Sequence, residues 1–235
     1  MTASVPPERA LVLLRRFEPV VRFTAGELFL PSPVDDFVAG SALVRGGHKT
    51  STELAPAGSL GLDSLAELGR RHAADALSLR RVADPLNSKA YRSWRRSRPP
   101  FRASSRFAVV GLPSRLVDAG VRLTLILRGT VPGGFTAAAH RAYACSDQTP
   151  TYYGRAMRDG GYLVLQYWFY YWMNDWRSSF GGVNDHEGDW EQVTIFLTDA
   201  EAAPTPRWVA YSAHDTVGDD LRRRWDDPDL TMVGE

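Results

Sequence analysis

The sequence predicts a mainly β, α+β fold: a two-layer antiparallel β-sandwich with helical insertions. Residues 161–172 are aromatic and β-branched and are apolar on both faces, which is typical of a central strand. Residues 189–197 form a second strand-like run after a loop containing Gly181 and Gly182, so the two segments predict an antiparallel hairpin. The 235 residues can bury a sizeable core. We expect one domain over 1–235, with a helical and loop insertion at 50–145.

The N-terminal third is expected to alternate short elements and loops. Residues 19–31 predict a strand, a turn at Gly26 and a second strand that ends at a proline. Residues 32–40 resemble a cap and one or two helical turns with a glycine stop. Residues 50–61 are rich in Ser, Ala, Gly and Pro and predict a loop, whereas the apolar spacing in 63–81 predicts a helix.

The middle of the chain predicts two further helices. Residues 87–105 are polar and arginine-dense, which favours a surface loop, and 107–111 predict a short strand. Residues 113–128 predict a helix, with proline in the first turn and glycine past its end. This helix is hydrophobic on most sides, which favours a buried helix over one on a membrane surface. Thr136 is expected to cap a short Ala-rich helix that runs through Cys145.

The C-terminal part predicts a third strand at 207–214, after which the sequence turns polar through 222–228. The chain stops at Glu235 without a closing element, and we therefore expect a truncated domain. The only cysteine, Cys145, allows no intrachain disulfide and is expected to be a small buried hydrophobe. The start of the chain lacks the features of a signal peptide, and the longest apolar run, 163–173, falls short of the ~20 residues of a membrane span. We expect a cytoplasmic protein, with peripheral membrane attachment as an alternative.

Charge is distributed unevenly although the net charge is +1. Residues 86–128 contain ten basic side chains and one acidic one, Asp118, whereas residues 175–235 contain fourteen acidic side chains and five arginines. Such runs are usually solvated faces. The alternative is a basic patch for the phosphate groups of lipid or nucleic acid. No nucleic-acid motif is present, and we expect no nucleic-acid partner.

The densest cluster of ionisable side chains lies at 185–191. Because residues i and i+2 of a strand share a face, Asp189 and Glu191 are expected to point inward with the apolar side chains that follow them. His186 joins them from the loop end, and Trp190 points to the other face. Unpaired buried charge is costly, so the cluster predicts a metal ion, proton transfer or a dense hydrogen-bond network.

Three interpretations of this cluster stay open. In the first, His186, Asp189 and Glu191 bind a divalent cation, with an oxygen from Asp185 or Asp175. Oxygen ligands with one imidazole suit Ca²⁺, Mg²⁺ or Mn²⁺ better than a structural zinc site.

In the second interpretation, Glu187, Asp189 and Glu191 resemble the carboxylate triplet of the laminarinase-type jelly-roll glycosidases, in which the outer two residues are nucleophile and acid. Gly188 interrupts this triplet. Four tryptophans would suit a sugar platform: Trp168, Trp172, Trp176 and Trp190. In the third, the carboxylates and His186 cap backbone amides and pair with Arg177 or Arg155.

Two families share these motifs. Residues 165–176 followed by 186–191 resemble the vacuolar protein sorting-associated protein 62 family, which has plant, fungal and bacterial members; residues 19–37 also look like the start of that family. The motif is similar, too, to the Gly-His-Arg-His-Asp-Trp-Glu heptad of the necrosis- and ethylene-inducing-peptide-like cytolysins. His186, Asp189 and Glu191 match the first His, the Asp and the Glu of that heptad, and Gly188 replaces its second His.

The second resemblance implies a β-sandwich that holds a divalent cation and binds lipid head groups at membranes. We therefore expect a non-catalytic, cation-binding module that recognises lipid head groups or glycans. A glycoside hydrolase using Glu187 and Glu191 is the alternative, and a scaffold without a ligand is a further one. The oligomeric state stays open.

Overall fold

The computed structural model describes residues 3–46, 51–98, 112–175, 185–200, 203–212 and 222–233. The chain divides into two compact units. Unit 1 comprises Met1–Arg22, Thr151–Tyr170 and Trp190–Glu235, and unit 2 comprises Phe23–Pro150 and Tyr171–Asp189. Unit 2 contains all of the expected insertion at 50–145. A single domain over 1–235 stays a prediction.

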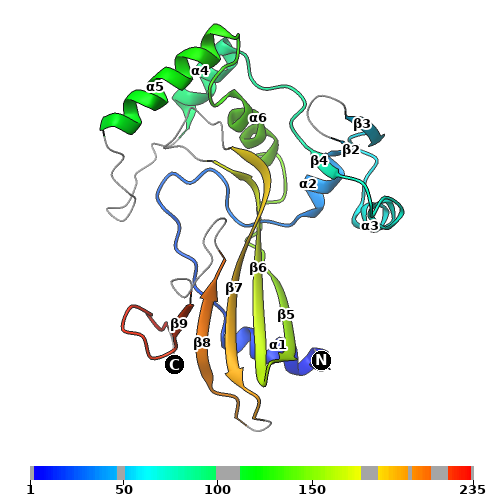
Figure 1. Ribbon diagram of the computed structural model, residues 1–235, viewed down its shortest axis with the longest axis vertical. Helices are drawn as coiled ribbons and strands as arrows, with labels where there is room; N and C mark the ends of the chain where they lie inside the picture. The colour runs from blue at the N-terminus through cyan, green and yellow to red at the C-terminus, as the bar shows by residue number, and fades with distance from the viewer. Residues whose placement is uncertain are drawn as a thin grey trace. The chain divides into compact units, whose positions relative to one another are not determined.

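Unit 1 is built on a six-stranded antiparallel sheet in the order β1-β5-β6-β7-β8-β9 (Figure 1). β5 and β6 are joined by Gly160 and Gly161, both at positive φ, in a two-residue turn of the kind that favours glycine. β6 and β7 are neighbours, as the sequence predicts. The strands are β1 (Ala3–Ser4), β5 (Tyr153–Asp159), β6 (Tyr162–Asn174), β7 (His186–Thr198), β8 (Pro206–Tyr211) and β9 (Arg222–Arg224). The end of β6 after Tyr170 and the start of β7 before Trp190 belong to unit 2.

Helix α1 (Pro7–Arg16) packs against β5 and β6. It begins with proline at its first position, where the missing N–H costs no hydrogen bond. On β6, Leu163, Leu165 and Tyr167 alternate on one face and are fully buried. The hydroxyl of Tyr167 donates to the carbonyl of Leu14 at 3.0 Å, and burial raises the pKa of this phenol. This hydrogen bond links the helix to the centre of the sheet.

Unit 2 contains a three-stranded antiparallel sheet, β3-β2-β4, made of β2 (Ala42–Arg45), β3 (Thr52–Ala55) and β4 (Leu77–Arg80). Two helices accompany it, α2 (Asp35–Ala39) and α3 (Leu62–Arg71). A small core unites these elements, because Val38, Leu43, Ala55 and Leu60 are buried together.

The other helices of unit 2 are α4 (Ser88–Ser97), α5 (Leu112–Leu127) and α6 (Gly134–Tyr143). Trp94 of α4 is buried, and its indole N–H donates to Nδ1 of His140 in α6 at 3.1 Å. Tyr143 of α6 contacts the buried Trp172 edge to face, with ring centres 5.7 Å apart. Aromatic packing therefore fixes α4 and α6 within this unit.

Two antiparallel sheets with helical insertions confirm the predicted fold class. The strands expected at 161–172, 189–197 and 207–214 are β6, β7 and β8. The helices expected at 32–40 and 113–128 are α2 and α5. Among the described helices, none has the length and apolarity that crossing a membrane requires.

Several local expectations were wrong, two of them because strand pairing outweighs local pattern. Residues 19–31 form no strand, although the turn at Gly26 is present with φ 87°. The expected loop at 50–61 contains β3, which pairs with β2. The helix expected over 63–81 ends at Arg71, and residues 77–80 pair with β2 instead.

Capping and exposure account for the other corrections. The expected loop at 87–105 contains α4, whose N-cap Asn87 accepts from the N–H of Ala90 at 3.0 Å. Helix α6 begins after Gly133, so Thr136 lies inside it rather than capping it. Cys145 is exposed rather than buried. The strand expected at 107–111 lies outside the described residues.

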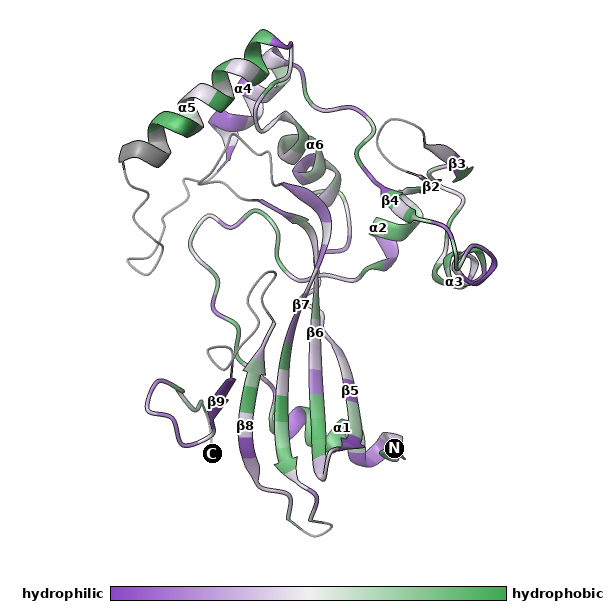
Figure 2. Ribbon diagram, in the orientation of Figure 1, coloured by the Kyte–Doolittle hydropathy of each residue, from purple (hydrophilic) through white to green (hydrophobic). Residues whose placement is uncertain are grey.

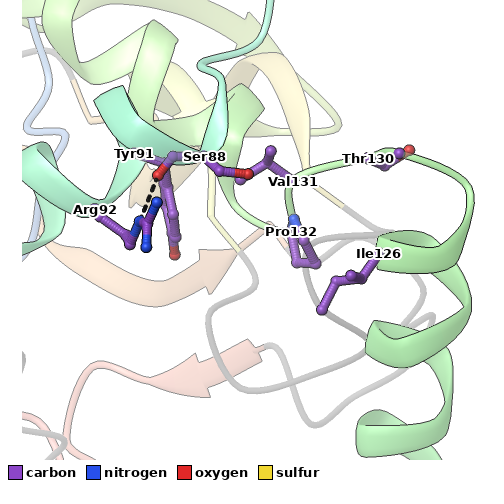
Figure 3. A pocket seen from close by; sticks show the side chains of 8 residues that line it. Ser88, Tyr91, Arg92, Ile126, Thr130, Val131 and Pro132 are labelled. Atoms are coloured by element: carbon purple, nitrogen blue, oxygen red, sulfur yellow. Dashed lines mark hydrogen bonds between the residues drawn. The ribbon is translucent and has the colours of Figure 1, made fainter.

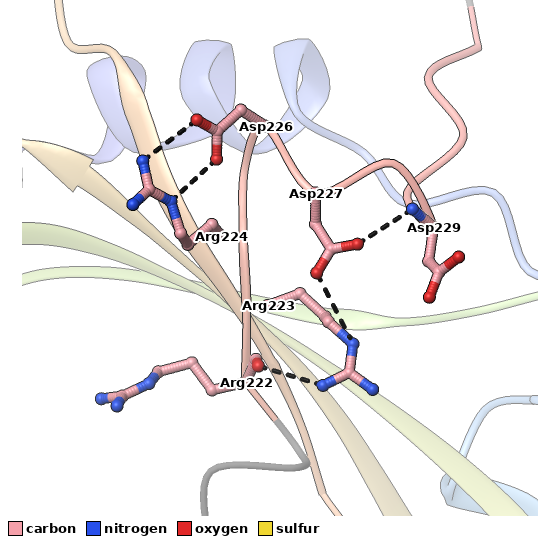
Figure 4. A network of polar contacts seen from close by, with 6 residues as sticks. All are labelled: Arg222, Arg223, Arg224, Asp226, Asp227 and Asp229. Atoms are coloured by element: carbon pink, nitrogen blue, oxygen red, sulfur yellow. Dashed lines mark hydrogen bonds and ion pairs between the residues drawn. The ribbon is translucent and has the colours of Figure 1, made fainter.

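The polar segment near the C-terminus joins the sheet rather than trailing from it. β9 pairs with β8 and continues into a turn held by its own ion pairs (Figure 4). Arg224 forms a two-point contact with Asp226 at 2.9 and 3.1 Å, and Asp227 accepts from the backbone N–H of Asp229 at 2.9 Å. The run of three arginines followed by three aspartates in 222–229 therefore has a local structural role.

Candidate functional site

The motif at 185–191 occupies the start of β7, and a glycine interrupts its strand geometry. Gly188 has φ 68°, in the left-handed region that a glycine adopts at little cost. Such a residue inside a strand is typical of a bulge. Asp189 is 8% exposed and Trp190 is 43% exposed, so these neighbours differ in burial as the strand phase predicts. The expected alternation does not extend unbroken across Gly188 to Glu187.

Asp189 is the most buried carboxylate of the motif. Its Oδ2 accepts from the side-chain amide of Asn174, the last residue of β6, at 3.0 Å. A carboxylate with so little access to water is stable only if hydrogen bonds or a positive charge compensate for its lost hydration. The position therefore suits either a structural hydrogen-bond network or a cation.

Glu187 holds two backbone amides at the end of β4. Its Oε1 accepts from the N–H of Val82 at 2.6 Å, and its Oε2 accepts from the N–H of Arg81 at 3.1 Å. Burial raises the pKa of the Glu187 carboxyl above its ordinary value, while these two N–H donors and the Arg81 charge oppose the rise. The contact joins segments more than a hundred residues apart within unit 2. Capping of backbone amides is what the structural interpretation predicted.

Asp185 is held by helix α6. The hydroxyl of Thr136 donates to Oδ2 of Asp185 at 2.5 Å. The buried Thr136 of α6 is therefore hydrogen-bonded to a residue of the motif. His186, the next residue, is exposed, and Asp175 is partly exposed beyond the end of β6. All of these residues belong to unit 2.

Glu191 belongs to unit 1 and has its own local partner. The hydroxyl of Ser212 donates to its Oε2 at 2.6 Å, and the N–H of Gln192 donates to the same hydroxyl oxygen at 2.7 Å. The expected ligand set is therefore divided between the units: His186, Asp189, Asp185 and Asp175 lie in unit 2, and Glu191 lies in unit 1.

The donor chemistry of the motif fits a hard divalent cation, but the described residues contain no ready-made cluster. Within the described ranges, no three or more His, Cys, Asp or Glu side chains are grouped so that they could hold a metal ion. Hydrogen-bond donors of the protein instead contact four motif carboxylates: Asp185, Glu187, Asp189 and Glu191. The five-residue metal site stays a prediction.

The tryptophans expected to form a sugar platform are not all gathered in one place. In unit 1, Trp190 contacts Tyr170, Tyr153 and Trp168, with ring centres 4.9, 5.5 and 6.4 Å apart. Trp172 is buried in unit 2. Trp176, like the expected ion-pair partner Arg177, lies outside the described residues.

Sequence reasoning missed the groups that hold the motif. Four supply hydrogen bonds by side chain or backbone N–H: Thr136, Asn174, Ser212 and Val82. Asn174 carried a usable signal, because it is polar at the end of an otherwise aromatic strand. The others carried none, because their roles depend on which distant segments become neighbours.

A family model described as "Necrosis inducing protein (NPP1)" matches residues 127–231, somewhat less than half of the 235 residues. The matched range contains α6, the strands β5 to β9 and the motif at 185–191. No curated protein and no solved structure matches the chain. The expected resemblance to the vacuolar protein sorting-associated protein 62 family finds no support in these comparisons. Over residues 127–231 the chain is therefore similar to the necrosis inducing proteins.

Proposed function

We propose that the chain is a divalent-cation-binding, non-catalytic β-rich module that recognises a lipid head group. The observation that carries the proposal is the position of the motif. His186 and Asp189 lie inside the range that matches the necrosis inducing proteins, and Asp189 is a buried carboxylate at the start of a central strand. A cation at this point would compensate the charge of Asp189 and offer its open coordination positions to a ligand.

The proposed ligands are His186 and Asp189, with Asp185, Asp175 and Glu191 as further oxygen donors. When bound, Ca²⁺, Mg²⁺ or Mn²⁺ supplies a positive centre for phosphate oxygens or sugar hydroxyls. Asp185 and Asp189 already accept hydrogen bonds from Thr136 and Asn174, so ion binding must exchange these bonds for ion contacts. We therefore expect modest affinity.

The finer relationships belong to the same proposal. A glycan is the alternative ligand, because sugar hydroxyls bind cations as head-group oxygens do. The proposed relationship to the vacuolar protein sorting-associated protein 62 family rests on residues 19–37, 165–176 and 186–191.

Thermal unfolding in titrations of each divalent ion tests the cation. The parent protein is first stripped with a chelator, and its melting temperature should then rise with at least one ion. Asp189→Asn should abolish the rise. Asp159→Asn, an exposed carboxylate at the end of β5, is the matched control and should keep it. If none of the three ions shifts the melting temperature, the proposal is wrong and the result favours a scaffold without a ligand.

Binding to vesicles that contain a glycosylated sphingolipid tests the ligand. Co-sedimentation should require the stabilising ion and should fail with chelator or in Asp189→Asn. Competition by the free sugar head group would identify recognition of the glycan portion, and equal binding with and without the ion would contradict the proposal.

One observation favours a glycoside hydrolase using Glu187 and Glu191 as the second candidate. Burial raises the pKa of Glu187, which is what a general acid requires. Glu187 is also bound to two backbone amides, which is what a structural residue requires. Sugar release from a panel of β-glucans, lost in Glu187→Gln, would support the enzyme; a fully active variant would exclude this pair.

A further inference from the structure

Helix α5 exposes an apolar stripe to solvent. Leu116, Leu123 and Leu127 are separated by seven and four residues, which places them on one face of the helix. Their exposed fractions are 67, 58 and 77%, and Val117 and Ile126 beside them are also exposed. Figure 2 colours much of α5 as hydrophobic. The sequence predicted this helix as buried, and its exposure is therefore the correction with the largest functional consequence.

Helix α4 carries a basic stripe in the same unit. Lys89, Arg92 and Arg96 are separated by three and four residues and are exposed. Trp94 points the other way, into the packing with α6. Within the described residues, no acidic side chain forms an ion pair with Lys89, Arg92, Arg95 or Arg96. The sequence from 86 to 131 contains one acidic residue, Asp118.

A pocket lies between α4 and the C-terminal end of α5. Arg92 of the basic stripe and Ile126 beside the apolar stripe line opposite parts of a cavity of about 480 Å³ (Figure 3). Ser88 and Tyr91 contribute hydroxyl groups on the α4 side, and Val131 and Pro132 contribute apolar surface on the other. Arg92 Nε donates to the carbonyl of Ser88 at 3.2 Å, which fixes the guanidinium stem at the pocket wall.

We propose that α4 and α5 form a docking surface for a membrane rich in anionic phospholipid. Leu116, Leu123 and Leu127 would enter the boundary between head groups and acyl chains, while the α4 stripe would contact lipid phosphates. The pocket at Arg92 would receive one phosphate head group. None of the motif residues takes part, so this docking needs no divalent cation.

Charge decides between a membrane and the other occupants of an apolar stripe. A second copy of the chain would bring two basic stripes together, which is electrostatically unfavourable. A nucleic acid would satisfy the arginines but would leave the leucines in water. A bilayer with anionic head groups satisfies both stripes at once.

Vesicle co-sedimentation in the presence of a chelator tests the proposal. The parent protein should bind phosphatidylcholine vesicles containing phosphatidylglycerol, and bind phosphatidylcholine alone far more weakly. Arg92→Gln with Arg96→Gln should weaken binding about fivefold for each charge removed. Leu127→Glu should weaken it at least tenfold, because this substitution removes buried apolar area and adds repulsion.

The matched control is Arg70→Gln with Arg71→Gln on α3, which removes the same charge from another exposed helix. The control should bind vesicles as the parent does. If both double variants lost the same amount of vesicle binding, net charge alone would explain the effect and the proposal would be overturned. Unchanged binding by Leu127→Glu would also overturn it, since attraction to a polyanion alone would then suffice.

Two further results would assign the surface differently. Suppose that the parent self-associates in sedimentation velocity, that Leu127→Glu abolishes this self-association and that the parent does not bind vesicles. A second copy of the chain would then be the occupant, and the proposal would be overturned. Asp189→Asn separates this surface from the proposed cation site. Parent-like vesicle binding by that variant supports the proposal, and its loss would contradict it while supporting the motif as the lipid site.

Discussion

Replacing Glu187 by glutamine should destabilise the protein by an amount that depends on pH. The carboxylate accepts from two backbone N–H groups, those of Val82 at 2.6 Å and Arg81 at 3.1 Å. A hydrogen bond to a charged acceptor contributes about 1.5–3 kcal/mol, and an N–H left unpaired in a buried place costs a similar amount. Glutamine retains one acceptor oxygen and turns an amide NH₂ toward the other donor. We expect a loss of about 2–3 kcal/mol at neutral pH.

Urea and thermal unfolding measure this loss. For a chain of this size, about 2–4 °C of melting temperature corresponds to 1 kcal/mol, so the variant should melt about 4–12 °C lower. Glu53→Gln is the control: its carboxylate lies exposed on β3, 3.8 Å from Arg80 in the same small sheet. A surface pair of this kind contributes about 0–1 kcal/mol, so the control should melt close to the parent.

The pH dependence follows from the raised pKa of Glu187. The folded state holds the proton of this carboxyl more tightly than the unfolded state does. The parent's stability from this group is therefore fully present below the ordinary glutamate pKa of about 4.3 and is lost as pH rises through the folded value. Because glutamine does not titrate, the stability gap between parent and variant should narrow over that window. If the stability difference between parent and variant widened as pH rises, burial would not be the dominant influence on the Glu187 pKa. A difference below about 0.5 kcal/mol would show that the two hydrogen bonds to Glu187 contribute little to stability.

Three further substitutions probe how the motif and the core are held. Gly188→Ala should cost about 1–2 kcal/mol in urea unfolding, because φ 68° strains any side chain; parent-like stability would show that the bulge relaxes freely. Asn174→Leu removes the amide donor of the buried Asp189 and should lower the free energy of unfolding by about 1–3 kcal/mol. A variant that is more stable than the parent, with and without chelator, would contradict this account. Tyr167→Phe should lower the free energy of unfolding by about 0.5–1.5 kcal/mol, because the Leu14 carbonyl loses its hydrogen-bond donor. This loss should be the same at every pH from 6 to 8, and an unchanged melting temperature would contradict the prediction.

Three strands of the large sheet, β6, β7 and β8, could be predicted because their signal is local. β6 is a continuous aromatic and β-branched run and β7 is a second strand-like apolar segment, so both were located from the sequence. β3 and β4 were missed, because four-residue strands carry too short a pattern. They form strands because β2 pairs with β3 along one edge and with β4 along the other, and a short local pattern does not reveal this pairing.

The candidate site divides in the same way. The residue types at 185–191 are a sequence property, and so is the break at Gly188, which only a glycine occupies without strain. The partners are not. Glu187 meets the amide of Val82, 105 residues earlier, and Asp185 meets Thr136, 49 residues earlier.

By itself, the sequence of this chain determined its mainly β class, its longest strands, the helical nature of residues 112–127 and the motif at 185–191, which lies inside the range that matches the necrosis inducing proteins. Only the tertiary structure decided that the leucines of α5 face solvent and that hydrogen-bond donors of the protein contact four motif carboxylates. The reason is physical. Backbone propensity and hydrophobic period act over a few residues, whereas burial and hydrogen-bond partnership depend on which distant segments the fold brings together.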